Sequence, residues 1–239
     1  MKYIGFFELV GFGPQGWGYM LAAAAGITIA IAVSGFLIGS LIGIFGAWAK
    51  ISGGRAVRTF AEGYTTVLRG IPDLLVIYLF YFGGSSLLST IGKLFGSNGF
   101  VNFPGFLAGA LAIGIASGAQ QTEVFRGAFS AVHRGEIEAA MACGMGQYLR
   151  FRRIIAPLTM RHALPGLGNV WQVALKGSAL VSVTGVVELL RQSQLGAGAT
   201  GLPFSFFIAA LVIYLIISTF SNWTFQIAET RFSRGVRRA

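Results

Sequence analysis

Long uncharged stretches constrain the fold of this chain more than any other feature of its sequence. The longest lie at residues 9–49, 74–92, 94–122, 162–187 (where only Lys176 is charged) and 192–228. A helix rises about 1.5 Å per residue, so about 20 apolar residues cross the hydrocarbon core of a bilayer. Only 11% of the residues are charged, which is too few to cover a soluble domain of this size. The sequence therefore predicts an all-α membrane protein.

The uncharged stretches predict five transmembrane helices joined by short segments. The predicted helices cover approximately residues 20–48, 70–91, 106–128, 163–187 and 204–227. Residues 1–19 combine aromatic side chains with Gly and Pro, which favours an N-terminal segment at the membrane interface. They lack the basic start of a cleaved signal peptide, so we expect the first helix to be retained. The turn-rich outer loops 92–105 and 191–203 are too short to form a solute-binding domain.

The basic residues are distributed unevenly between the two sides of the predicted helices. The formal net charge is +10, and most of the 18 Lys and Arg residues fall into three groups. These are Lys50, Arg55, Arg58 and Arg69; then Arg126, Arg134, Arg150, Arg152, Arg153 and Arg161; then Arg231, Arg234, Arg237 and Arg238. Two predicted helices separate each group from the next, so the positive-inside rule places all three in the cytoplasm. The N-terminus is then outside, residues 231–239 form a basic cytoplasmic tail, and binding of nucleic acid is not expected.

Glycines recur at four-residue steps within two of the predicted helices. Gly35, Gly39 and Gly43 share one face of the first helix, and Gly114 and Gly118 share a face of the third, as do Gly105 and Gly109. Small residues let helix backbones approach closely in lipid, where hydrophobicity does not drive helices together. We therefore predict helix-packing surfaces at these positions, with direct contact to a solute as the alternative.

A polar segment interrupts the apolar pattern after the third predicted helix. Residues 136–141 favour a helix whose first-turn acids complement the positive helix N-terminus. Either Gly144 or Gly146 can end that helix in the left-handed conformation. A basic helical run follows, and Pro157 and Pro165 are expected to mark the turn back into the membrane. By itself, the segment could be an amphipathic helix that lies on lipid headgroups.

The same segment carries a spaced motif. Its letters are E-A-A-x3-G-x9-I-x2-P, formed by Glu138, Ala139, Ala140, Gly144, Ile154 and Pro157. This pattern resembles the EAA loop of the membrane subunits of bacterial ABC importers. Further segments are similar to polar amino-acid permeases, and most of all to the histidine/lysine/arginine/ornithine and opine branch: residues 62–66, 69–72, 122–127 and 182–189. One departure is Gly177, which stands after Lys176 where the family usually has Asp.

The resemblance implies a type I ABC-transporter transmembrane domain over residues 20–230, with the EAA loop at 133–157. In this family the loop forms a cytoplasmic coupling helix that docks on a separate ATPase. The implied docking residues are Glu136, Glu138, Ala139, Ala140, Gly144, Ile154 and Pro157. The implied partners are a second, paralogous permease subunit, two ATP-binding subunits and an external solute-binding protein. ATP and Mg would be bound by the ATPases, so this chain is expected to be a cofactor-free transport subunit of the bacterial inner membrane, not an enzyme.

Three charged residues fall within or beside the predicted helices and are candidates for the solute pathway. Lys176 lies near the middle of the fourth helix, where an unpaired charge costs at least about 2.5–3.5 kcal/mol. It is expected to line the pathway or to pair with an acid, for which Glu123 and Glu188 are candidates. Glu123 could instead pair with Arg126, three residues further along the same helix. If the solute is a basic amino acid, one acid must stay available for it, and Glu123→Gln would then impair basic solutes more than neutral ones.

Several other kinds of chemistry lack their sequence signals. The chain has no G-x-x-x-x-G-K-[ST] nucleotide loop, no H-E-x-x-H and no G-x-S-x-G. Its histidines, His133 and His162, make a poor metal site, and the single cysteine, Cys143, excludes an internal disulfide. The main alternative is a secondary amino-acid transporter or a channel subunit without ATP coupling. Secondary transporters usually have more helices and internal repeats.

Overall fold

The computed structural model describes residues 6–14, 16–96 and 99–233. The described part of the chain is helical and contains no β-strand, so the predicted all-α fold is confirmed. Most of the predicted basic tail, including Arg234, Arg237 and Arg238, lies outside the described residues. The helices are α1 (Phe6–Val10), α2 (Gly18–Ser52), α3 (Arg55–Gly70), α4 (Asp73–Leu94), α5 (Gly105–Ser130), α6 (Arg134–Ala142), α7 (Gln147–Arg150), α8 (Ala156–Gly177), α9 (Leu189–Thr200) and α10 (Pro203–Phe232).

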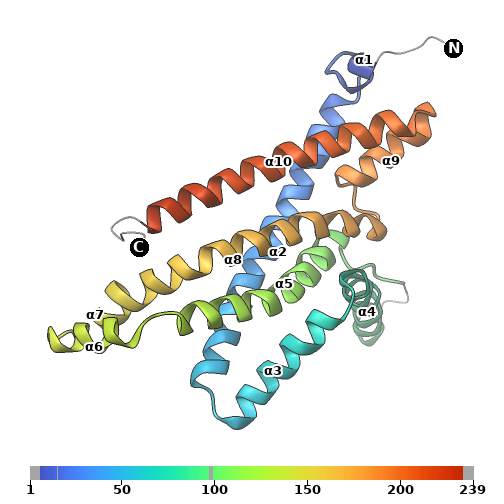
Figure 1. The fold of residues 1–239 in the computed structure, drawn as a ribbon. Helices are drawn as coiled ribbons and strands as arrows, with labels where there is room; N and C mark the ends of the chain where they lie inside the picture. The colour runs from blue at the N-terminus through green and yellow to red at the C-terminus, as the bar shows by residue number, and fades with distance from the viewer. Residues whose placement is uncertain (1–5, 15, 97–98, 234–239) are drawn as a thin grey trace.

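Helix α5 is the centre of the bundle. It contacts α2, α3, α4 and α8, while α10 lies on the other side of α8 and also contacts α9 (Figure 1). Small residues make this position possible, because α5 is rich in Gly and Ala and half of its 26 residues are buried. Its glycines and glutamines lower its hydropathy below that of the outer helices. A helix covered by protein on several sides does not need an apolar surface for lipid.

The contact between α2 and α5 is the most extensive in the bundle, and glycines line both of its faces. A methyl group added at Gly39 would lie 2.2 Å from Ser117 Oγ, and one at Gly43 would lie 2.7 Å from Gln121 Cβ. The contact is reciprocal, because Gly35 faces Ile113 while Gly114 and Gly118 face Ile38 and Ile42. No side chain larger than hydrogen fits at these positions without displacing the partner helix.

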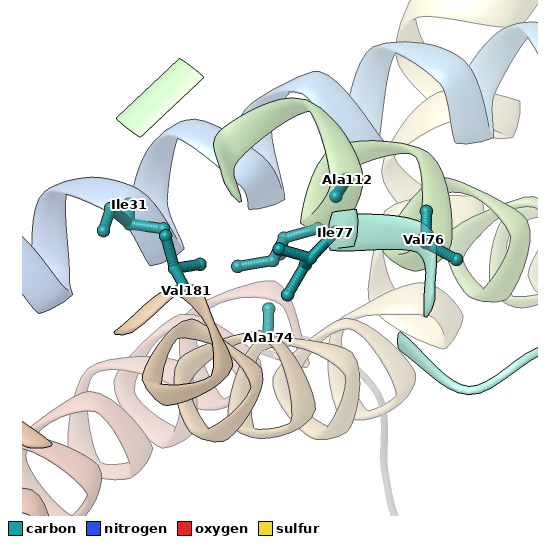
Figure 2. Close-up of a cluster of buried hydrophobic side chains, with 7 residues drawn as sticks. Ile31, Val76, Ile77, Ala112, Ala174 and Val181 are labelled. Atoms are coloured by element: carbon teal, nitrogen blue, oxygen red, sulfur yellow. The ribbon is translucent and has the colours of Figure 1, made fainter. Parts of the chain in front are cut away.

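A cluster of buried aliphatic side chains joins the helices away from this contact. Figure 2 shows Ile31, Val76, Ile77, Ala112, Ala174 and Val181, which come from α2, α4, α5, α8 and the 3-10 segment Ser178–Thr184. Since these elements are distant in sequence, the cluster fixes their positions around α5.

Three helices of the described residues, α2, α4 and α10, are long and apolar enough to cross a membrane. The chain from Gln147 to Thr184, taken together with α9, is a fourth candidate that bends by 51°. Helix α5 does not meet the same criterion of length and apolarity, because its glycines and glutamines lower its hydropathy. The structure therefore supports three to four spans by length and apolarity, and the fifth predicted span remains a prediction.

Two local predictions were wrong. Residues 189–200 form helix α9 instead of an outer loop, because the Glu188 side chain accepts hydrogen bonds from the first N–H groups of the helix. The predicted turn at Pro157 and Pro165 is absent, since Pro157 lies in the first turn of α8 and Pro165 lies inside it. The π-helical segment Phe151–Ile155 continues the helix from α7 into α8, so both prolines lie within one continuous helical stretch.

The N-terminal segment folds back onto the start of α2. The Trp17 N–H donates to the Leu9 carbonyl at 2.8 Å, and the Gly18 N–H donates to the Gly11 carbonyl at 3.0 Å. The Leu9 side chain is buried, and α1 contacts α10. The position of this segment at the membrane interface remains a prediction.

Candidate functional site

Helix α6 contains the predicted coupling helix and ends at Gly144. Gly144 has a φ of +74°, its N–H donates to the Met141 carbonyl, and the Met145 N–H donates to the Ala140 carbonyl. This pair of bonds is the Schellman motif, in which a residue with left-handed backbone reverses the chain at a helix end. Of the two glycines considered from sequence, Gly144 is the one with this conformation.

A groove lies between α6 and the start of α8, with a volume of about 550 Å³. Its lining residues come from three segments: Glu136, Ala139, Ala140, Cys143 and Met145; then Arg153, Ile154, Pro157, Leu158 and Arg161; and Phe232 at the end of α10. The two halves of the spaced motif therefore meet in space. Five of the seven predicted docking residues line the groove, Gly144 ends the helix beside it, and Glu138 is exposed outside it.

The groove combines an apolar floor with charged edges. Ala140, a residue of α6, is buried at the floor of the groove. Glu136, Arg153 and Arg161 place opposite charges at the rim. Ala139 is exposed and carries only a methyl group, so a partner surface can approach the α6 backbone closely. An apolar floor with a charged rim is the arrangement found in protein–protein interfaces.

A second, polar pocket of about 600 Å³ lies among the α3–α4 junction, α5 and α8. Its polar lining consists of Arg69, Asp73, Gln120, Glu123 and Asn169. Asp73, in the first turn of α4, has no side-chain hydrogen bond and no ion pair within the described part of the chain. Sequence reasoning missed Asp73, although an acid that directly follows an X-Pro turn at a membrane boundary was a usable signal.

Glu123 lines this pocket, but its carboxylate is already occupied. Lys50 Nζ donates to Glu123 Oε1, and Arg126 lies 2.8 Å from Oε2. The predicted pairing with Arg126 is present, whereas Lys50 was not foreseen. Lys50 also donates to Thr65 Oγ1 at 2.6 Å, so the network joins α2, α3 and α5.

A tyrosine in α3 reinforces that junction. The Tyr64 hydroxyl donates to the Ile115 carbonyl of α5 at 2.6 Å. Burial raises the pKa of Tyr64 to about 12, so the hydroxyl keeps its proton and donates at physiological pH. Helix α3 is therefore held against α5 from two points.

Lys176 and Glu188 do not meet each other or Glu123. Lys176 is exposed in the last turn of α8, where a cation is favourable to the helix dipole, and it forms no ion pair within the described residues. Glu188 is fully buried and accepts from the Leu190 and Arg191 N–H groups at 2.9 and 2.7 Å. The expected pair with Lys176 is therefore absent, because the candidate acids have closer donors.

Comparison with known proteins assigns the chain to a family. Residues 35–234 match the family described as binding-protein-dependent transport system inner membrane component. The octopine transport system permease protein OccQ of Rhizobium meliloti is 57% identical, with 98% of this chain and 99% of that protein covered. The histidine/lysine/arginine/ornithine transport system permease protein HisQ of Escherichia coli is 42% identical, with 94% and 98% covered.

A solved structure agrees with this assignment. A crystal structure of an amino acid ABC transporter with histidines superposes with a TM-score of 0.75 at 31% identity, with 90% of this chain and 95% of that chain covered. The family match, the relatives and the fold all agree with the resemblance to ABC importer permeases that the motif along the α6 groove indicated. The chain belongs to the family of inner membrane components of binding-protein-dependent transport systems, as a permease subunit of an ABC importer.

Proposed function

We propose that this permease carries an opine or a basic amino acid into the cell, with octopine as the first candidate. The observation that carries this proposal is the 57% identity to the octopine permease along nearly the full length of both chains. A nopaline permease of Agrobacterium fabrum at 47% identity and the histidine/lysine/arginine/ornithine permease at 42% support the same class of solute.

The proposed topology has five spans, with the N-terminus outside and the C-terminus in the cytoplasm. In this arrangement α2, α4, α5, α8 with its 3-10 extension, and α10 cross the membrane. The basic residues near the α2–α3 turn, on α6 to α8 and at the end of α10 then share the cytoplasmic side, as the positive-inside rule requires. The contact of Phe232 with the α6 groove supports this, since it brings the end of α10 to the same side as α6.

The proposed coupling site is the α6 groove. A separate ATPase would contact the exposed face of α6 and the rim residues Glu136, Arg153 and Arg161. Since the turn at Gly144 joins α6 to α7, and α7 continues through the π-helical segment into α8, a displacement of α6 would be transmitted to a membrane helix. Two ATPases and a second, paralogous permease subunit complete the proposed assembly, and an external solute-binding protein delivers the solute.

The proposed solute pathway includes the polar pocket. Asp73 is the acid that remains free within it, because both oxygens of Glu123 are engaged by Lys50 and Arg126. A free carboxylate can meet the cationic group of the solute, and Gln120 and Asn169 can hydrogen-bond its polar atoms. Glu123, Lys176 and Glu188 remain candidates for the solute pathway. Glu123 lines the pocket, and Lys176 and Glu188 lie outside it.

Uptake into proteoliposomes tests this proposal. The complete complex would be reconstituted with its solute-binding protein and ATP, and uptake of octopine, arginine and a neutral amino acid such as glutamine would be compared. We expect octopine or arginine uptake that requires ATP and the binding protein. Preferential glutamine uptake would reject the solute class, whereas uptake without ATP would reject the coupling to an ATPase.

A further inference from the structure

An apolar groove separate from the coupling site lies at the same end of the bundle. It has a volume of about 710 Å³ and is formed by the ends of α2, α5 and α10 and by the start of α8. Its lining residues include Phe45, Trp48, Phe129, Phe151 and Met160. Trp48 is 66% exposed and Phe45 is equally so, which leaves two large side chains of α2 without a protein partner.

Three polar residues interrupt this apolar lining: Ser52, Arg152 and Thr159. Arg152 lines the groove and forms no ion pair with a carboxylate in the described residues. Thr159 also lines it, and its hydroxyl oxygen is buried without a hydrogen-bond partner. A helical threonine commonly donates to the carbonyl four residues earlier. Because this oxygen is buried, it is not open to the groove, and Arg152 is the charged group that an occupant can reach.

We propose that this groove binds an anionic phospholipid of the cytoplasmic leaflet. The acyl chains would lie along the aromatic surface of α2 and α5, and the phosphate would meet the Arg152 guanidinium. Charge complementarity selects an anionic lipid, since Arg152 has no ion pair among the described residues and no acid lines the groove. Basic pockets between membrane helices recognise anionic headgroups in this way.

The size and the aromatic lining of the groove fit that occupant. Its volume is within the range of about 300–1,000 Å³ typical of small-molecule sites. Trp48 belongs to a residue type that concentrates at the headgroup level of a membrane. Pro157 and Phe232 line both this groove and the α6 groove, so the proposed lipid would lie directly behind the coupling site.

Photolabelling of the complete transporter in nanodiscs tests the proposal. The probes are phosphatidylglycerol and phosphatidylcholine with the same photoreactive acyl chain, and labelled peptides are identified by mass spectrometry. We expect phosphatidylglycerol to label residues 44–52 and 151–160 more strongly than phosphatidylcholine does. Arg152→Gln should lower that labelling about fivefold, the effect of one basic residue near an anionic surface. Arg191→Gln is the control, because Arg191 is exposed on α9 and lines neither groove, and it should leave labelling unchanged.

A second variant keeps the test independent of folding defects. Ala156→Trp fills the groove from the surface of α8 and should abolish labelling by both lipids while the complex still assembles. Equal labelling by both probes would mean that the groove holds bulk lipid only and would overturn the proposal. Cross-links from Phe45 or Trp48 to the second permease subunit would overturn it as well, because they would identify the groove as a subunit interface.

Discussion

Lys50 on α2 and Glu123 on α5 form an ion pair in which the lysine is almost completely buried. The Lys50 side chain is 7% exposed and the Glu123 side chain is 23% exposed. Arg126 shares the carboxylate, and Thr65 shares the ammonium. The pair therefore fixes the end of the α2–α5 contact nearest the α2–α3 turn, and the position of α3 beside it.

The two partners of this pair should differ in how strongly they affect stability. Glu123→Gln leaves Lys50 buried with only Thr65, so we expect a loss of about 3 kcal/mol, at the low end for a broken buried pair. Lys50→Met leaves Glu123 partly solvated and still paired with Arg126, so we expect a loss of about 1 kcal/mol. Thermal unfolding of the purified subunit gives both values, and the double variant should cost less than their sum. Strict additivity would contradict a direct interaction.

Gly39 should tolerate no side chain. Gly39→Ala places a methyl group 2.2 Å from Ser117 Oγ and should destabilise the α2–α5 contact by about 1–3 kcal/mol, the usual cost of overpacking. Gly26→Ala, in the same helix, has no atom within 4 Å and serves as the control. Thermal midpoints of the two variants provide the comparison. Equal midpoints would mean that α2 and α5 are further apart than the structure has them.

Gly144 should be required for coupling because of its backbone conformation. No atom lies within 4 Å of an added methyl group, so Gly144→Val acts through the strained φ of +74° and not through a clash. We expect ATP hydrolysis to lose its dependence on the solute-binding protein while assembly is partly preserved. Gly144→Asn should retain more coupling, since Asn tolerates left-handed backbone better than Val. Gly135→Ala, at an unstrained position of the same helix, is the control.

Asp73 should select for positive charge on the solute. Asp73→Asn removes the free carboxylate of the polar pocket and should reduce uptake of a basic solute about tenfold or more, consistent with loss of a charged hydrogen bond of about 1.5–3 kcal/mol. Uptake of a neutral competitor should change little. Glu123→Gln, in contrast, should impair all solutes alike through the structural defect described above. If Glu123→Gln impaired basic solutes selectively and Asp73→Asn did not, Glu123 would be the acid that meets the solute, and the prediction for Asp73 would be wrong.

The sequence predicted the parts of the fold that depend on local composition. The uncharged stretches located α2, α4, α5 and α10 to within a few residues, because apolar length is a local property. Helix α3 was not recognised as a separate element, since its charges placed it between predicted spans. Helix α9 was mistaken for a loop because its glycines outweighed the capping carboxylate of Glu188, whose role depends on burial between α2 and α10.

The sequence likewise predicted only part of the candidate site. The resemblance identified both halves of the α6 groove, and the structure shows that they meet. The pairing of Lys50 with Glu123 could not be predicted, because the two lie 73 residues apart and their contact depends on the register of α2 against α5. Asp73 was overlooked because its importance comes from the lack of a hydrogen-bonding or ionic partner in the described structure, which the sequence alone does not reveal.

The single cysteine allows the most direct test of the coupling site, since Cys143 is exposed and lines the α6 groove. The complete complex would be treated in sealed inverted vesicles with a short heterobifunctional maleimide cross-linker, and the products would be identified by mass spectrometry. We predict that Cys143 cross-links to the ATPase subunit, and that removing the ATPase increases the rate at which Cys143 reacts with a bulky impermeant maleimide. Labelling of Cys143 only from the periplasmic side, or equal reactivity with and without the ATPase, would contradict the account.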